Sequence, residues 1–222
     1  MEEQHTLERR VVAVLGDVVR SRAHPSRPDL QADVRSALAR TNAAGSSLQP
    51  LTTTIGDEFQ GLFDDVATAL EATLRVRLAL LPSADVRFGI GWGPLSTFDR
   101  ERAPFEQDGP AWWAAREAVD RVRDTTHRRE MPRGVRTWFQ ATDPEAAPLV
   151  ATINAFLLCR DELVASMSAG DAATMLGLLD GEPPSRIAEE QGVTVSAVSQ
   201  RAIRGGLYAI RLAHEGMREA AP

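Results

Sequence analysis

The segment from 184 to 205 constrains the fold most tightly, because three of its residues are spaced as two helices meeting at a tight turn require. It reads PSRIAEEQGVTVSAVSQRAIRG. Ala188 is small enough for the helix crossing, Gly192 permits a positive φ in the turn, and Val198 is a β-branched residue for the shared core. We expect the rest of the apolar face to comprise Ile187, Val195 and Ile203. The pattern predicts a helix-turn-helix.

The second helix of this motif is expected to bind double-stranded DNA in the major groove. The net charge of −6 repels phosphate, so any DNA contact needs a local basic surface. Residues 195–213 provide one, since their only charged residues apart from histidine are Arg201, Arg204 and Arg211. The candidates for base contacts are Ser196, Ser199, Gln200 and Arg204, and those for phosphate contacts are Thr194 and Arg201. The alternative is a helical hairpin that serves packing or dimerisation.

Apolar and polar segments alternate through the rest of the chain. Strands are predicted over 10–19, 51–55, 59–63, 85–92 and 135–140. Helices are predicted after Asp29, from Asp64 or Asp65 to Pro82, and from Pro110, with a long connector helix over 146–167. The order β-α-β-β-α-β-α-β is that of an α+β fold with a split βαβ, ferredoxin-like sheet and helices on one face.

We therefore expect three parts, namely a domain over 1–145, a connector over 146–169 and a helix-turn-helix domain over 170–222. Cys159 is the single cysteine, so an internal disulfide is excluded. The charged N-terminus has no apolar signal region, and no apolar run approaches the roughly 18 residues of a membrane helix. A cytoplasmic protein without a membrane span is expected.

Two aspartates are the candidates for a metal site. Asp17 ends the first predicted strand and Asp57 occupies the predicted hairpin turn. The first strand and the hairpin are neighbours in a split sheet, so both carboxylates can meet at one edge. Close carboxylates repel unless a cation lies between them, and Mg²⁺ bound to carboxylates and substrate phosphates is a common solution. Glu58 can join the site or point to the other face. The alternative is that both aspartates are turn or cap residues.

The motifs around these aspartates resemble those of the palm-type nucleotidyl cyclases, both the class III cyclases and the GGDEF proteins. LGDVVRSR and TIGDEFQGLF resemble the two metal motifs, VRFGIGWG resembles the following strand, and the Ala-Ala-Arg at 114–116 resembles a catalytic helix. The resemblance implies that Asp17 and Asp57 hold Mg²⁺ with help from the Val18 carbonyl. It also implies that Ser21 lies near the triphosphate and that Arg116 keeps its arginine position. Arg20 and Arg22 flank the strand end as counter-ions or phosphate ligands.

This sequence departs from the cyclases where they place a transition-state asparagine, since Trp112 or Trp113 stands there. The Lys/Asp pair that recognises adenine is not identifiable either. Loss of the polar group would remove transition-state stabilisation rather than binding. A domain that binds a nucleotide without cyclising it is therefore at least as credible as a working enzyme.

Over most of its length the chain resembles the SatD family of bacterial proteins. GDVVRSR, GDEFQGLF, RFGIGWG and the terminal helix-turn-helix stand in that family's order. The last part also resembles region 4 of sigma factors. Our hypothesis is a homodimeric DNA-binding regulator whose palm-like domain binds a nucleotide and Mg²⁺ without turnover. The alternatives are an Mg²⁺-dependent nucleotidyl cyclase with an accessory helix-turn-helix and a non-catalytic interaction protein.

Overall fold

The computed structural model describes residues 9–54, 56–99, 106–125 and 132–220. The strands are β1 (Arg10–Val18), β2 (Gln49–Thr53), β3 (Glu58–Phe63), β4 (Val86–Pro94), β5 (Ser96–Asp99), β6 (Glu106–Asp108) and β7 (Thr137–Ala141). The helices are α1 (Arg27–Ala44), α2 (Val66–Leu80), α3 (Pro110–Thr125), α4 (Ala147–Ala165), α5 (Ala169–Leu179), α6 (Pro184–Gln191), α7 (Val195–Arg204) and α8 (Leu207–Ala220). The predicted mixture of strands and helices is confirmed.

Five of these strands form one sheet in the order β2-β3-β1-β4-β7. β1 is antiparallel to both of its neighbours, β2 and β3 form an antiparallel hairpin, and β7 is parallel to β4. β1 therefore lies beside the hairpin, as the sequence predicted. β5 and β6 form a separate two-stranded ribbon, in a segment for which the sequence predicted only a loop.

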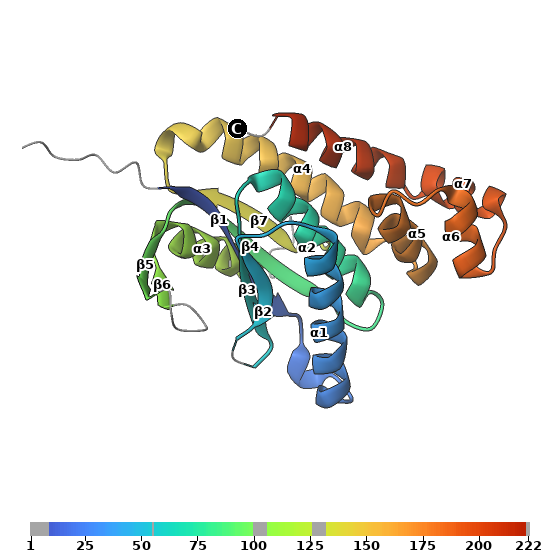
Figure 1. Ribbon diagram of the computed structural model, residues 1–222, viewed down its shortest axis with the longest axis horizontal. Helices are drawn as coiled ribbons and strands as arrows, with labels where there is room; N and C mark the ends of the chain where they lie inside the picture. The colour runs from blue at the N-terminus through green and yellow to red at the C-terminus, as the bar shows by residue number, and fades with distance from the viewer. Residues whose placement is uncertain (1–8, 55, 100–105, 126–131, 221–222) are drawn as a thin grey trace, which may run out of the picture.

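Helices cover both faces of this sheet, so the prediction of helices on one face is wrong. Val12, Val14 and Val18 of β1 belong to the core that includes α1 and α2. The alternate residues Val11, Ala13 and Leu15 share a second cluster with α3. Figure 1 shows α3 and α2 on opposite sides of the sheet. β1 is apolar on both faces because both faces are buried.

Glycines in β4 allow α3 to lie directly on the sheet. A Cβ atom at Gly89 would stand 2.0 Å from the Ala115 carbonyl oxygen, and one at Gly91 would stand 2.1 Å from the Ala111 carbonyl oxygen. No side chain fits between strand and helix at these two positions. The glycines of VRFGIGWG are therefore explained by helix packing.

An asparagine side chain satisfies the backbone at each outer strand of the sheet. On β2, the Asn42 amide donates to the Leu51 carbonyl and its oxygen accepts from the Leu51 N–H, both at 2.9 Å. On β7, Asn154 donates to the Phe139 carbonyl at 2.8 Å and accepts from the Phe139 N–H at 2.9 Å. An edge strand whose central residue is already bonded is a poor template for another strand.

The four C-terminal helices α5–α8 pack against α2 through a shared apolar core. Leu74 and Leu78 of α2 belong to the same cluster as Met175, Val198 and Leu207. Figure 1 shows α8 returning along the same side of the molecule as α4 and α2. Polar contacts add to this packing, since Arg75 forms an ion pair with Asp180 and Arg218 forms one with Glu71. The domain boundaries at 146 and 170 stay a prediction.

The α6–α7 pair has the turn that the spacing predicted. Gly192 ends α6 with a φ of 63°, and Ala188 and Val198 are buried. The expected apolar face is wrong in part, because Val195 is 48% exposed and Ile203 is 69% exposed. Val198 and Ala202, four residues apart, form the buried side of α7, and Ile203 lies about 100° further round the helix. Among the described helices, none is both long and apolar enough to span a membrane.

Candidate functional site

Charged side chains from three strands meet at the end of β1. Asp17 pairs in register with Glu58 of β3 on one side and with Arg87 of β4 on the other. Side chains alternate along a strand, so Asp17 points to the same face as Leu15, the face that α3 covers. Glu58, as the cross-strand partner of Asp17, points to this face too. We call Asp17, Glu58, Arg87, Arg116 and Arg123 the charged cluster.

Three arginines surround the two carboxylates of the charged cluster. The Oδ2 atom of Asp17 lies 3.2 Å from Arg87 Nη2 and 3.5 Å from Arg123 Nη2. The Oε1 atom of Glu58 lies 3.7 Å from Arg123 Nη2, and its Oε2 atom lies 3.5 Å from Arg116 Nη2. Arg116 and Arg123 are seven residues apart on α3, about two helical turns, so they lie on the same side of the helix, from which both reach Glu58.

The sequence indicated Arg116 but missed the roles of Arg87 and Arg123. Arg87 is the second residue of the glycine strand VRFGIGWG that the resemblance identified, and its register opposite Asp17 is the signal that could have indicated its role. Arg123 belongs to an arginine-rich stretch that is typical of a solvated surface. The only sequence signal for a role of Arg123 at the site is its position two helical turns after Arg116.

Burial and neighbouring acids govern the protonation of Asp17. Its side chain is 13% exposed, and this burial raises the pKa of Asp17 above its ordinary value. Arg87 and Arg123 oppose the increase in pKa, whereas Asp57 and Glu58 add to it. Asp17 and Asp57 are therefore close enough for their negative charges to repel each other.

Asp17 and Asp57 are the candidate carboxylates for a cation that is bound together with phosphates. In the parts of the chain that the structure describes, no three acidic, histidine or cysteine side chains gather as a metal site. Mg²⁺ is usually held by only one or two carboxylates plus phosphate oxygens and water. Asp17 and Asp57 provide two such carboxylates, whose mutual repulsion a cation would relieve. The metal assignment of Asp17, Asp57, Glu58 and the Val18 carbonyl stays a prediction.

A cleft of about 980 Å³ opens beside the charged cluster, at the end of the sheet where β1 finishes. Its lining includes Val19, Arg20, Ser21, Arg87, Arg133 and Arg136. Ser21 also lines a smaller cavity of about 240 Å³, which contains Asp57 and Thr54. Ser21 thus lines both cavities, and its place near a triphosphate stays a prediction. Arg22 is exposed and lies outside both linings.

The two tryptophans at the position of the cyclase asparagine have different surroundings. Trp112 is 8% exposed and packs among the β1 residues of the α3-facing core. Trp113 is 60% exposed, and its indole N–H donates to Asp108 at 2.7 Å. Neither side chain brings a carboxamide to the charged cluster.

The six residues predicted to contact DNA lie on α7 or cap it. Thr194 caps the helix by accepting from the Ala197 N–H at 3.1 Å. Arg201 donates to Gln191 at 2.6 Å, so it already binds α6 within the chain. Ser196, Gln200 and Arg204 are exposed, and Ser199 is half-buried. Their role in DNA binding stays a prediction.

Several solved structures of cyclase-related domains are similar to this chain. The guanylyl cyclase domain of the RhoGC fusion protein from the aquatic fungus Blastocladiella emersonii has a TM-score of 0.41 and 18% identity, and the match covers 51% of this chain and 74% of that chain. The guanylate cyclase domain of RhGC from Catenaria anguillulae, solved with GTP, has a TM-score of 0.40 and 17% identity, with 51% and 73% covered. An EAL/GGDEF domain protein from M. capsulatus has a TM-score of 0.42 and 16% identity, with 65% and 90% covered.

Sequence comparisons give one family. No significant match was found among curated proteins. The model of the SatD family matches residues 11–207.

Proposed function

The chain belongs to the SatD family, and we propose that it binds a nucleotide together with Mg²⁺ at the Asp17–Asp57 end of its sheet, without turning it over. One observation carries the proposal. A partly buried aspartate, repelled by a second aspartate, pairs with Arg87 and Arg123, and Arg87 also lines the neighbouring arginine-rich cleft. In this proposal β1 to β4 with α1 and α2 act as a ferredoxin-like palm.

The charges of the site suit a phosphate ligand with a divalent cation. Arginine guanidinium groups bind phosphate oxygens through charge-assisted, often paired hydrogen bonds. Mg²⁺ would be held by Asp17 and Asp57, with Glu58 and the Val18 carbonyl as further oxygen donors, and would neutralise charge on the phosphates. Ser21, Arg22 and Arg116 are the residues we expect nearest to the nucleotide.

Binding without turnover follows from the residues near α3. Catalysis needs groups that bind the transition state better than the ground state. Trp112 is occupied in the core and Trp113 is bonded to Asp108, so neither supplies the polar group that the cyclases use. The charged cluster can still bind phosphates, because its arginines act on ground state and transition state alike.

We predict that replacing Asp17 and Asp57 together by asparagine abolishes the Mg²⁺-dependent part of nucleotide binding. Each amide keeps the shape of the side chain but removes the charge that holds the cation. Calorimetric titration with ATP and GTP, with and without Mg²⁺, measures the effect. Because the pKa of Asp17 is raised, wild-type affinity in Mg²⁺ should also begin to fall at a higher pH than an ordinary aspartate would give.

Asp64→Asn is the matched control, since it removes an exposed carboxylate just after β3 whose ion pair is with Arg9. This variant should bind as the wild type does. Unchanged affinity in the double variant would contradict the metal site. A cyclic nucleotide among the products of the titrated wild-type sample would instead favour the cyclase reading.

A second function is favoured by the surface of α7, and we propose that this helix binds double-stranded DNA in the major groove. Ser196, Gln200 and Arg204 are exposed near one another, and the chain has no acid between Gly192 and His214. Thr194 and Arg201 would lie toward the DNA backbone and Ser199 at the edge of the contact. A homodimer would present two such helices to paired half-sites.

Arg204→Ala should weaken binding to a duplex selected from a random library by roughly 1–3 kcal/mol, if this arginine reads a base edge. Fluorescence anisotropy at a fixed salt concentration measures the change. Arg186→Ala is a suitable control, because Arg186 is exposed on α6 and bonded to Glu190. If both variants bind the duplex equally well, the exposed side of α7 does not contact DNA. Either another surface of the protein binds DNA or the protein does not bind it.

A further inference from the structure

The arginine-lined cleft extends across three strands of the sheet. Val18 of β1 is in register with Val86 of β4, and Phe88 of β4 is in register with Thr137 of β7. The end of β1 and the start of β7 therefore lie at the same edge. Adjacent strands are about 4.8 Å apart, so the end of β1 and the start of β7, with β4 between them, lie roughly 10 Å from each other.

The flank at β1 carries Arg20, immediately after the strand. Its backbone has a φ of 55°, and no other described residue except glycine has a positive φ. Such a conformation costs energy in a non-glycine residue and is frequent at ligand sites. The Arg20 side chain is exposed and forms no ion pair with any described residue. Next to it, Arg87 is already bound to Asp17.

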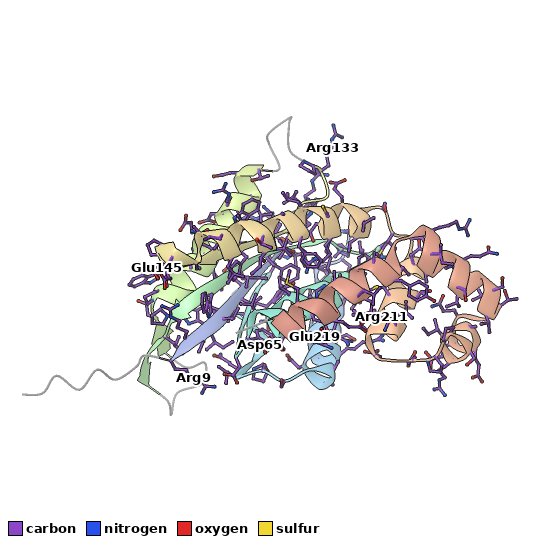
Figure 2. The ribbon with its side chains drawn as sticks, turned by 90° about the horizontal axis from the view of Figure 1, so that it is seen from above. Arg9, Asp65, Arg133, Glu145, Arg211 and Glu219 are labelled. Atoms are coloured by element: carbon purple, nitrogen blue, oxygen red, sulfur yellow. The ribbon has the colours of Figure 1, made fainter. Side chains whose placement is uncertain are left out.

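The flank at β7 holds Arg133 at the rim on a fixed backbone. The Arg136 guanidinium binds Asp85 Oδ2 at 2.6 Å and donates to the Arg133 carbonyl at 2.9 Å. The Arg136 N–H donates to the buried Asp161 at 2.7 Å. Figure 2 shows the Arg133 side chain extending outward from the body of the molecule. Within the described ranges, Arg133 has no ion pair.

Between these flanks the lining is mixed, with the apolar Val19, Leu81 and Pro82 beside the polar His24 and Asp85, and the Asp85 carboxylate is already paired with Arg77 and Arg136. A single phosphate chain could bind the arginines of only one flank, either Arg20 and Arg87 or Arg133. The arginine of the other flank would then have no phosphate to bind. We propose that the cleft binds a nucleotide with phosphate groups at two separate positions of its sugar, one toward Arg20 and Arg87 and the other toward Arg133. This inference rests on the proposed function and names its ligand class.

Two isomers test the proposal directly. Adenosine 3′,5′-bisphosphate and ADP have the same atomic composition. The bisphosphate carries one phosphate at each of two sugar positions, whereas ADP carries both phosphates in one chain at the 5′ position. Calorimetric titration in Mg²⁺ compares the two isomers, and the same titration is repeated with guanosine 3′,5′-bisphosphate and GDP. For whichever base binds more tightly, the 3′,5′-bisphosphate should bind about tenfold more tightly than the diphosphate. Arg133→Ala should remove this preference and change ADP binding little, whereas Arg186→Ala should keep it.

The outcomes separate this inference from the function on which it rests. Equal affinity for both isomers, with binding still dependent on Asp17 and Asp57, would overturn the two-phosphate ligand and leave the nucleotide site standing. A preference that survives Arg133→Ala would also overturn it. Inorganic tripolyphosphate binding as tightly as the bisphosphate would show that the cleft takes anions of any kind. No binding of any nucleotide would overturn both proposals.

Discussion

Replacing Asp161 by alanine is expected to lower the free energy of unfolding by about 3–5 kcal/mol, because it leaves the buried Arg160 without its counter-ion and removes one of the two carboxylates that pair with the buried Arg77. Asp161 is completely buried, and its Oδ1 atom lies 3.2 Å from Arg77 Nη1 and 3.0 Å from Arg160 Nη2. Its Oδ2 atom accepts from the N–H groups of Arg136 and Thr137, each at 2.7 Å.

The cost of this substitution comes from groups that cannot reach water. Burial lowers the pKa of Arg160, and Asp161 is the neighbour that most opposes this decrease. Without the carboxylate, two buried guanidinium groups each lose one of their acceptors, and the N–H groups of Arg136 and Thr137 lose the carboxylate that accepts from them. Asp161 thus joins α4 to α2 and to the start of β7.

Urea unfolding followed by circular dichroism measures the loss. Glu190→Ala is the control, because it removes an exposed partner of Arg186 and should cost no more than about 1 kcal/mol. A loss below about 1 kcal/mol for Asp161→Ala would mean that water or a rearranged acceptor reaches the arginines.

Gly89→Ala is expected to destabilise the fold by about 3 kcal/mol, at the upper end of the usual cost of overpacking. The added Cβ would stand 2.0 Å from the Ala115 carbonyl oxygen and 2.5 Å from the Val119 nitrogen. Both are backbone atoms of α3, so the whole helix has to move. Because α3 carries Arg116 and Arg123, nucleotide affinity should fall as well.

Gly45→Ala is the matched control, since a Cβ there meets nothing within 4 Å. Thermal unfolding of both variants, with ATP titration of the folded protein, checks the prediction. Similar melting temperatures for the two variants would mean that α3 does not pack against β4 as described.

The sequence by itself predicted the features that depend on neighbouring residues. Asp65 caps α2 by accepting from the Thr68 N–H, Pro110 opens α3, and Gly192 turns the chain between α6 and α7. Each depends on backbone preferences within a few residues, which local patterns encode. The motifs around Asp17 and Asp57 likewise indicated the family and the end of the sheet where charges gather.

Only the tertiary structure decided which face each helix covers and which charges meet. α3 lies opposite α1 and α2, Arg87 and Arg123 meet Asp17, and Ile203 faces outward. These outcomes depend on contacts between residues far apart in the chain, such as Gly89 and Gly91 beneath α3. The local sequence pattern shows which side chains are apolar and which are charged. Its partner is determined by packing of the whole chain, where burial and close approach select one arrangement.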